Sequence, residues 1–534
     1  MQTFDFVIVG SGSAASIIAA RLAAAGRTVC VLEAGPPDSN PFIRMPAGFI
    51  KTLFDPKATW QFATAPNPHT NDRAIQITQG RTLGGSSSVN GMVYNRGQAA
   101  DYDTWAQMGL RGWGHADLLD YFRRTEQRLG EGDDRFRGRD GPMTTSISPW
   151  PNAITDAFLA AAVAAGYPRN PDYNGESHDG AGLYQSTIRS GRRVSTASAF
   201  LHPARRAHGI DVKTRSLATR ILLEDGRATG VEYVREGSPE TQRVSANQAV
   251  VVSAGVINSP KLLQLSGLGP ADLLSCHGIA VEQDLPGAGR NLRDHYSPRL
   301  VARARAGVDS INGRVTGLPL AMQFARWLAG RPSVLALSPA QAHVFGRTDP
   351  ALDITDFALV FAPGSFRQGF IGKLDDFPGM TCGAWVMRPD SAGRVEITSG
   401  DPRAAPLIDP NYMSAETDRR KLVAALKIAR RLLTSPEMRA VVDAEIFPGP
   451  DVVTDDEWLG FARQYGNSAY HLVGTCRMGG ESDPMAVVDD RLRVRGVRGL
   501  VVADASVMPT LPSSNTAAPS MMIGEKASDL LLGR

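Results

Sequence analysis

Cysteine is scarce in this sequence, and the pattern around it excludes several kinds of site. The 534 residues include only four cysteines, Cys30, Cys276, Cys382 and Cys476. None of them forms a C-x-x-C pair, and no His/Cys spacing typical of a zinc site occurs. We therefore expect four reduced thiols and no metal centre.

Long apolar runs and an excess of charge of one sign are also missing. No stretch of about 18 apolar residues is present, so no transmembrane helix is predicted. The first strand-like run follows Met1 closely, without the features of a signal peptide, which predicts a cytoplasmic location. The net charge is only +3, and the arginines are scattered. This does not favour binding to nucleic acid or to an anionic membrane surface.

The composition is that of an ordinary globular protein. Hydrophobic residues make up 43% and charged residues 21% of a chain that also contains 54 glycines and 35 prolines. These values are typical of a loop-rich α/β enzyme. A single hydrophobic core rarely supports this length, so we expect two or more domains.

The N-terminus has the pattern of a βαβ unit. Residues 4–9 (FDFVIV) and 28–32 are predicted to be buried strands, and the Ala-rich residues 13–25 are predicted to be the helix between them. Such a unit implies parallel strands joined by a right-handed crossover. The apolar runs at 248–253 and 499–503 predict two more strands. If all lie in one parallel sheet, their C-terminal ends share a ligand-binding crevice, and the nucleotide domain is discontinuous.

The remaining regions predict a second domain with a mixed or antiparallel sheet. Residues 386–398 alternate like a strand, and residues 421–433 form an amphipathic helical pattern. The Pro- and Asn-rich residues 40–78 predict an irregular, lid-like loop. The predicted division gives the first domain residues 1–148, 203–309 and 461–534, and the second domain residues 149–202 and 310–460.

The first chemical motif is GSGSAA, residues 10–15. Gly10 permits a tight strand-to-helix turn, Gly12 allows a pyrophosphate to approach the backbone, and Ala15 allows close helix packing. The helix N-terminus then offers free N–H groups to phosphate. Glu33 ends the second strand, where a ribose-binding acid is expected. Together these features indicate a dinucleotide site.

Three further motifs follow along the chain. GRTLGGSSSVN (80–90) lets the backbone pass close to a flat or phosphate-bearing ligand. SAGVINSPKLLQLSGLG (253–269) predicts a strand end and then a helix that begins at Ser259-Pro260, with serine as N-cap and proline in the first turn. RNLRDH (290–295) predicts a surface loop in which Asp294 pairs with His295.

Two C-terminal motifs complete the set, YHLVGTCRMG (470–479) and PTLPSSNTAAP (509–519). In this order the six motifs resemble the glucose–methanol–choline (GMC) family of FAD-dependent oxidoreductases, in its bacterial choline/alcohol dehydrogenase-like branch. The resemblance extends from residue 4 to about residue 526. The chain departs from the family pattern at Val256, where a small or hydroxyl residue is usual. The implied fold is α/β: a Rossmann-like FAD-binding domain with a parallel sheet, plus a substrate domain with a mixed or antiparallel sheet.

The resemblance implies FAD as the cofactor. Val89 stands where some members carry a histidine bonded to the flavin, which implies that FAD is held non-covalently. The implied cofactor contacts are Gly10, Gly12, Ser13, Ala14, Ala15, Glu33, Ala34, Arg81, Gly84, Gly85, Ser87, Asn90, Gly91, Val93, Ala254, Asp504, Ala505, Asn515 and Thr516.

The resemblance also implies a reaction, the oxidation of a primary alcohol to an aldehyde. His471 would take the hydroxyl proton with Asn515 beside it, the flavin would take the hydride, and O2 or another acceptor would re-oxidise the flavin. Tyr470 and Gln341 are candidate substrate contacts. Gln341 aligns with a glutamate that binds the ammonium group in choline-acting members. An uncharged alcohol is therefore favoured over choline.

Other activities on this fold remain open. A hydroxynitrile lyase shares the histidine but transfers no hydride, and a choline dehydrogenase or oxidase would differ only in its substrate. A fatty-acid photodecarboxylase lacks the histidine at position 471. A flavin-binding scaffold without catalysis would not need the His471–Asn515 pair.

Overall fold

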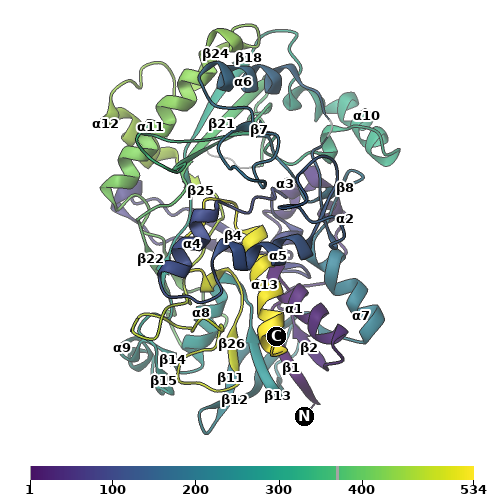
Figure 1. The fold of residues 1–534 in the computed structure, drawn as a ribbon, viewed down its shortest axis with the longest axis vertical. Helices are drawn as coiled ribbons and strands as arrows, with labels where there is room; N and C mark the ends of the chain where they lie inside the picture. Colours follow the sequence, from purple (N-terminus) through teal and green to yellow (C-terminus); the bar gives the residue numbers. More distant parts are fainter. Residues whose placement is uncertain (1, 149, 368–371) are drawn as a thin grey trace.

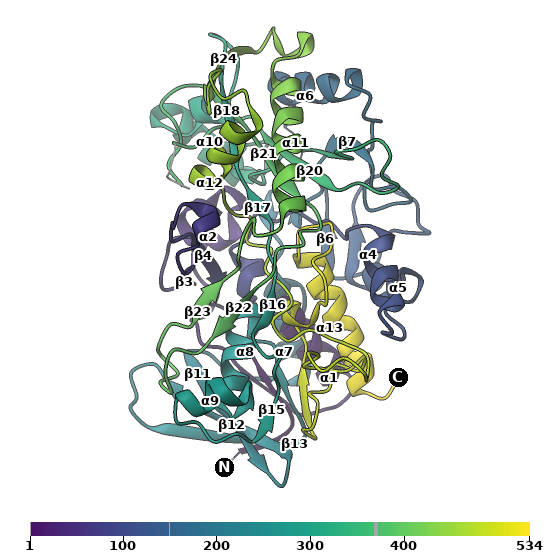
Figure 2. The same ribbon diagram turned by 90° about the vertical axis from the view of Figure 1, so that its left-hand side faces the viewer.

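The computed structural model describes residues 2–148, 150–367 and 372–534. Two large sheets lie toward opposite ends of the long axis, and both termini lie in the lower half of the view (Figure 1). Segments from both ends of the sequence build the lower half (Figure 2). The domain boundary predicted at residue 149 falls on a residue outside the described ranges.

The lower sheet has seven strands in the order β10-β2-β1-β13-β12-β11, with β26 paired to β13. The pairs among β10, β2, β1, β13 and β26 are parallel, whereas β11, β12 and β13 pair antiparallel. The parallel sheet built from distant parts of the chain is therefore confirmed. The strands are β1 (Gln2–Val9), β2 (Val29–Leu32), β10 (Asp211–Lys213), β11 (Ser216–Glu224), β12 (Arg227–Arg235), β13 (Thr241–Val252) and β26 (Leu500–Val502).

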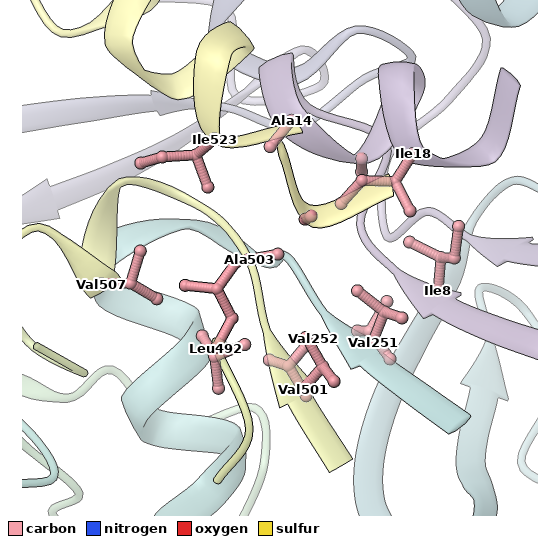
Figure 3. Close-up of a cluster of buried hydrophobic side chains, with 14 of the residues drawn as sticks. Ile8, Ala14, Ile18, Val251, Val252, Leu492, Val501, Ala503, Val507 and Ile523 are labelled. Atoms are coloured by element: carbon pink, nitrogen blue, oxygen red, sulfur yellow. The ribbon is translucent and has the colours of Figure 1, made fainter. Parts of the chain in front are cut away.

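Helices α1 (Ser13–Ala24) and α13 (Ala517–Leu531) pack on this sheet and on each other. Figure 3 shows Ala14 and Ile18 of α1 beside Ile523 of α13, above the valines of β13 and β26. A Cβ at Gly524 would lie 2.8 Å from the Ala14 carbonyl oxygen, so the helices approach closely there. The strands are apolar along their whole buried length because both faces of a parallel sheet are covered.

The upper sheet has six antiparallel strands in the order β24-β18-β21-β20-β19-β7. Side chains alternate across it. Leu300, Phe361 and Cys382 belong to a core shared with α6 (Ala153–Ala164), α11 (Glu416–Leu433) and α12 (Asp455–Tyr465). The alternate residues of the same strands face away from this core. The strands are β7 (Gly180–Leu183), β18 (Arg299–Ala304), β19 (Ala342–Gly346), β20 (Phe357–Ala362), β21 (Gly379–Val386) and β24 (Val442–Phe447).

Strand β18 belongs to the upper sheet, although it lies before the domain boundary predicted at residue 310. The remaining elements connect or flank the two sheets. The helices are α4 (Ala99–Gln107), α5 (His115–Thr125), α7 (His202–His208), α9 (Ala271–Cys276) and α10 (Gly317–Leu328). The short strands are β5 (Glu126–Arg128), β6 (Met143–Thr145), β8 (Ile188–Arg189), β9 (Arg192–Arg193), β14 (Leu268–Gly269), β15 (Gln283–Asp284), β16 (Arg290–Leu292), β17 (Tyr296–Ser297), β22 (Gly393–Glu396), β23 (Leu407–Asp409) and β25 (Asn467–Ser468). Among the described helices, none combines the length and hydrophobicity needed to cross a bilayer.

The prediction that residues 40–78 are irregular was wrong. They contain α2 (Pro41–Arg44), α3 (Phe49–Thr52) and an antiparallel hairpin of β3 (Thr59–Ala63) and β4 (Gln76–Gly80). Phe62 and Ile77 pair across the hairpin and pack in an apolar cluster with Leu292 and Leu472. Most of the prolines and asparagines lie between these elements or at the start of a helix, and their local signals outweighed those of the short strands.

Helix α8 (Gly255–Leu265) also differs from its prediction, because it begins four residues before Ser259 and contains Pro260. A proline in a helix leaves the carbonyl four residues earlier without its N–H donor. Here the orphaned carbonyl is that of Val256, and the Thr475 hydroxyl donates to it at 2.5 Å. The replacement donor comes from a distant segment, so no local pattern could indicate it.

Candidate active site

A cavity of about 400 Å³ lies between the two sheets. Its lower wall is formed by the C-terminal ends of β1, β2 and β13 and by the N-terminus of α1. Its upper wall is formed by β18, β20 and β21, on the face that points away from the helix-covered core. His471 and Asn515 also line it. This is the crevice position at which parallel α/β sheets bind ligands.

The turn from β1 to α1 leaves space where a ligand could approach. Gly10 has a φ of 97°, and a Cβ there would lie 2.3 Å from the Ser253 carbonyl oxygen. At Gly12, by contrast, a Cβ would meet no atom within 4 Å. No side chain caps the N-terminus of α1, and no acidic residue lies in its first turn. The free N–H groups of this turn suit an anionic phosphate.

Two carboxylates stand at the ends of parallel strands on the same side. Glu33 follows β2 and accepts hydrogen bonds from the backbone N–H groups of Ser11 at 3.1 Å and Gly35 at 2.8 Å. Burial raises the pKa of Glu33, and the hydrogen bond from the Ser11 hydroxyl opposes this. Asp504 follows β26 and accepts from the Gly255 N–H at 2.8 Å and from the Ser259 hydroxyl. These bonds fix both carboxylates in the cavity wall.

The GRTLGGSSSVN segment bends around the cavity. A Cβ at Gly85 would lie 2.7 Å from Gly12 Cα, so the two glycine turns touch. Asn90 lines the cavity, but its side-chain oxygen accepts from the Met92 N–H and from Arg193.

The residues predicted to contact the cofactor divide into two groups. The larger group lines the cavity: Gly10, Gly12, Ser13, Ala14, Glu33, Ala34, Gly85, Asn90, Gly91, Val93, Ala254, Asp504, Ala505, Asn515 and Thr516. The other described positions, Ala15, Arg81, Gly84 and Ser87, are not among the residues that line the cavity. The Ser87 hydroxyl donates to the Gly84 carbonyl at 2.6 Å, which holds the loop in shape.

His471 and His295 meet at the other end of the cavity. Strand β17 pairs antiparallel with β25, and the Ala469 N–H donates to the His295 carbonyl at 2.8 Å. This pairing brings His295 Nδ1 within 2.9 Å of His471 Nδ1. The prediction of a surface loop at residues 290–295 was therefore wrong. His295 is fully buried, because the polar motif is enclosed between two distant segments.

The hydrogen-bond partners determine which nitrogen of each ring carries a proton. His295 Nε2 lies 2.7 Å from the Met387 carbonyl oxygen, which can only accept, so His295 is protonated at Nε2. The neutral ring therefore accepts at Nδ1, and His471 must donate from its own Nδ1. His471 Nε2 keeps its lone pair. It lies 2.8 Å from the Asn515 side-chain nitrogen, which is a donor.

Burial keeps both rings neutral. It lowers the pKa of His295 to about 4, and it lowers the pKa of His471 well below the usual histidine range, with a further contribution from His295. The predicted pairing of Asp294 with the His295 side chain was wrong. Asp294 accepts from the Ser468 and Tyr412 hydroxyls and, at 2.7 Å, from the backbone N–H of His471. Burial raises the pKa of Asp294 to about 6.

Two further groups complete this end of the cavity. The Asn515 side-chain oxygen is buried and has no hydrogen-bond partner among the residues that the structure describes, which leaves it free for a ligand. The Trp385 ring stacks on His295 with 5.6 Å between centroids and meets His471 edge-on at the same distance. His471 Nε2 is thus a neutral base between an amide and an indole, in a cavity wall shielded from bulk water.

The two candidate substrate contacts lie differently. Tyr470 lines the cavity next to His471 and has a φ of 63°, an unusual conformation for a non-glycine residue. Gln341 is buried, and its amide donates to the Ser338 carbonyl at 2.6 Å. Its neighbours Pro339 and Ala340 belong to the described cavity lining, whereas Gln341 does not.

Sequence reasoning missed His295 and Trp385 as members of this site. The motif that contains His295 was recognised, but its partner lies 176 positions away. Trp385 has no motif around it. Its position follows only from the side-chain alternation of β21, which a sequence cannot connect to a cavity.

Comparison with known proteins agrees with this geometry. Residues 4–297 match the N-terminal model of the GMC oxidoreductases, and residues 389–524 match the C-terminal model. The chain belongs to the GMC oxidoreductase family. It is an FAD-dependent oxidoreductase of CH–OH donors. FAD fits this cavity for three reasons. There is open space at Gly12, the first turn of α1 has free N–H groups, and the Asn515 side-chain oxygen has no partner among the described residues.

Several relatives cover almost the whole chain. An oxygen-dependent choline dehydrogenase of Sinorhizobium fredii is 41% identical over 532 residues, 99% of this chain and 96% of its own length. One of Photobacterium profundum is 38% identical, covering 99% and 93%. Among solved structures, pyridoxine 4-oxidase from Mesorbium loti has a TM-score of 0.88 at 30% identity, covering 99% of both chains. A substituted Aspergillus oryzae formate oxidase has a TM-score of 0.93 at 25% identity, covering 100% and 98%.

Proposed function

We propose that this protein oxidises a primary alcohol to the aldehyde, with His471 as the base. The observation that carries the proposal is the lone pair on His471 Nε2, which the His295–Met387 hydrogen-bond chain places in the cavity beside Asn515. A base with a pKa below neutrality is already deprotonated at pH 7 and can accept a proton at once.

The residues would act together on the alcohol hydroxyl. His471 Nε2 accepts the hydroxyl proton, and the imidazolium that forms stabilises the developing alkoxide. The Asn515 side-chain nitrogen, which donates to His471 Nε2 before an alcohol binds, would then donate to the same oxygen instead. FAD, when bound, supplies the hydride acceptor. The Trp385 ring lies edge-on to His471 and would shield this nitrogen from water, which would strengthen both interactions.

We infer that the cofactor lies along the lower wall. The pyrophosphate would meet Gly12 and the first turn of α1, and the ribose would meet Glu33. Val89 lines the cavity and has no group that could bond to the flavin, so we propose non-covalent FAD. Gly84 and Ser87 would act by shaping the loop. The proposed division of the chain is the one predicted from the sequence, with β18 added to the substrate part.

The names of the relatives support two refinements, which also remain proposals. Because a relative is named an oxygen-dependent choline dehydrogenase, we propose O2 as an acceptor of electrons from the reduced flavin. The name also supports choline as a second candidate substrate. Gln341 supplies no charge for the ammonium group of choline, since it is neutral and bonded to the backbone. A cytoplasmic location stays a prediction of the sequence.

Anaerobic mixing with a panel of primary alcohols tests the proposal. We expect one or more alcohols to bleach the visible flavin absorbance, and admission of air to restore it at a rate that separates an oxidase from a dehydrogenase. The panel includes choline, benzyl alcohol and hexanol. More efficient oxidation of choline than of the uncharged alcohols would contradict our substrate assignment. Cleavage of a cyanohydrin without any bleaching would favour the lyase.

A further inference from the structure

The upper wall of the cavity contains a cation that the proposed reaction does not use. Arg299 is the first residue of β18, and it lies on the face of the upper sheet that points away from the helix-covered core. The next residue, Leu300, points into that core. The Arg299 side chain lines the cavity, and burial lowers its pKa. Arginine nevertheless remains charged near neutrality.

Arg299 has no charge partner in the part of the chain that the structure describes. No carboxylate among the described residues lies within 4.0 Å of its guanidinium, and it makes no hydrogen bond with them. The six residues outside the described ranges are Met, Pro, Gln, Gly, Phe and Ile, so none of them can supply a carboxylate.

Several other buried or half-buried arginines of the chain make ion pairs or hydrogen bonds within the protein. Arg137 pairs with Glu126 and Asp172, and Arg430 pairs with Glu445 at 2.6 Å. Arg193 has no carboxylate partner, but it donates to the Ile43 carbonyl at 2.9 Å and to Asn90 at 2.8 Å. Buried charges are normally paired in this way because an isolated one is costly. Arg299 differs from these three arginines because its guanidinium has no such partner among the described residues.

The neighbours of Arg299 leave room for a ligand and supply no negative charge. Gly383 pairs with Arg299 across the sheet, and a Cβ at position 383 would lie 3.5 Å from Arg299 Cγ and 3.1 Å from Ser297 Oγ. Ser297 and Thr381 contribute hydroxyls to the same wall. The titratable side chain that acts on Arg299 is the phenol of Tyr470, next to the base. The wall is thus positive and polar.

We propose that Arg299 binds an anionic group, a carboxylate, on the alcohol that this enzyme oxidises. The guanidinium presents a planar fork that matches a carboxylate in two hydrogen bonds. The aromatic rings of Trp385 and Tyr470 line the same cavity, with Trp385 edge-on to His471 and Tyr470 close enough to act on Arg299. The substrate class is therefore an alcohol whose other end carries a carboxylate, with an aromatic spacer suited to these rings. The same charge repels the quaternary ammonium of choline. This inference rests on the proposed alcohol oxidation.

A matched pair of alcohols tests the charge alone. 4-(Hydroxymethyl)benzoate and 4-(hydroxymethyl)benzamide have nearly the same shape and the same reacting group. With the FAD-loaded enzyme we expect kcat/KM to be at least about tenfold higher for the benzoate, as a hydrogen-bonded charge pair typically gives. Arg299→Gln should bring this ratio to about one or below. Arg299→Lys should retain part of the preference, because it keeps the charge but loses the fork.

A matched control comes from the same strand. Arg303 lies four residues further along β18, is exposed, and has its guanidinium 4.0 Å from the Asp443 carboxylate. Arg303→Gln should leave the ratio unchanged. A ratio near one in the wild type, or a ratio unchanged by Arg299→Gln, would overturn the assignment. Loss of FAD from Arg299→Gln would overturn it as well, since the guanidinium would then serve the cofactor.

A binding measurement separates this inference from the reaction itself. 4-Methylbenzoate and 4-methylbenzamide carry no hydroxyl and can be titrated against the flavin absorbance. We expect the carboxylate to bind more tightly to the wild type, and the difference to vanish in Arg299→Gln. If these titrations succeed while no alcohol bleaches the flavin, alcohol oxidation fails and the anion site stands. If alcohols bleach the flavin while the titrations show no preference, the anion site fails alone.

Discussion

The imidazole of His471 is set apart from an ordinary buried histidine by the direction of its hydrogen bonds. The Met387 carbonyl fixes the proton on His295, and His295 in turn requires His471 to donate from Nδ1. The lone pair is left on the nitrogen beside Asn515. A backbone carbonyl remote from the cavity thus determines which atom is the base. His295 is a positioning residue in this scheme, because it acts through His471.

Two substitutions of His295 separate positioning from simple packing. His295→Leu removes the acceptor for His471 Nδ1, and we expect flavin reduction to slow by roughly 10–100-fold with FAD retained. His295→Gln places an amide oxygen that can accept the same bond, so it should recover part of the rate.

The wild-type rate should be constant above pH 7 and fall only below pH 6.5, because burial lowers the pKa of His471.

The pH profile of His295→Leu distinguishes the positioning role. Removing the second ring removes one cause of the depressed pKa of His471, so the acid limb should move toward higher pH. Stopped-flow absorbance between pH 4 and 9 measures the rate of flavin reduction in the wild type, in His295→Leu and in His295→Gln. Equal rates and superimposable profiles for the leucine and glutamine variants would show that His295 only fills space.

At the scale of single elements, the turn from β1 to α1 was predictable and the turn into α8 was not. Strands β1 and β2 and helix α1 lie within one or two residues of their predicted bounds. Their apolar runs and the GSGSAA motif carry all the information locally. Helix α8 contains Pro260 because Thr475, more than 200 positions away, replaces the missing donor. Local propensity is overridden there by a tertiary contact.

The glycine turn can be tested with a pair of alanine substitutions. A Cβ at Gly12 meets no protein atom within 4 Å and would extend into the proposed phosphate site. Gly12→Ala should therefore weaken FAD binding at least about tenfold, while the apoprotein keeps its thermal stability or gains slightly from the stiffer chain. Flavin titration and apoprotein melting measure the two effects.

Gly26 provides the matched control for this turn. It follows α1, has a φ of 78° and would also place a Cβ in open space. Gly26→Ala should lower the melting temperature through backbone strain of about 1–2 kcal/mol and leave FAD affinity intact. Unchanged FAD affinity in Gly12→Ala would place the phosphates elsewhere.

At the scale of the whole molecule, the two sheets could be predicted from the sequence, but the cavity that they form together could not. The parallel sheet, its discontinuous origin and the antiparallel partner sheet follow from strand patterns and motif order. The joint cavity depends on side-chain alternation in β18 and β21, which places Arg299 and Trp385 in its wall. Contacts between segments hundreds of residues apart leave no local signal. His295, Arg299 and Trp385 became visible only in the structure.

The buried histidines make global stability depend on pH. Burial lowers the pKa of His178 to about 3 and of His295 to about 4, and it lowers those of His343 and His471 well below 6.5. Below pH 6.5 these histidines bind protons in the unfolded chain but stay neutral in the folded chain. The free energy of unfolding therefore decreases as the pH falls toward 4. Asp294 acts oppositely, because its raised pKa lets the folded chain hold a proton up to about pH 6.

The histidines outnumber the carboxyls with raised pKa values, Asp294 and Glu33. Their net effect is a loss of stability as the pH falls. We expect the melting temperature to fall steadily from pH 7 to pH 4.

His343 stacks on Phe345 with 4.3 Å between centroids, so His343→Phe should reduce the loss between pH 8 and pH 5. Exposed His208→Phe is the control and should leave that loss unchanged. An identical acid loss in His343→Phe would contradict the assignment.

The central claim is that His471 Nε2 removes the alcohol proton, and one measurement tests it most directly. Anaerobic stopped-flow mixing of FAD-loaded wild type and His471→Ala with a reducing alcohol compares the rates of flavin bleaching. We predict that the variant keeps its FAD and slows by about 10²–10⁴-fold, the contribution typical of a general base. A variant that retains FAD and bleaches within about tenfold of the wild type would contradict the account.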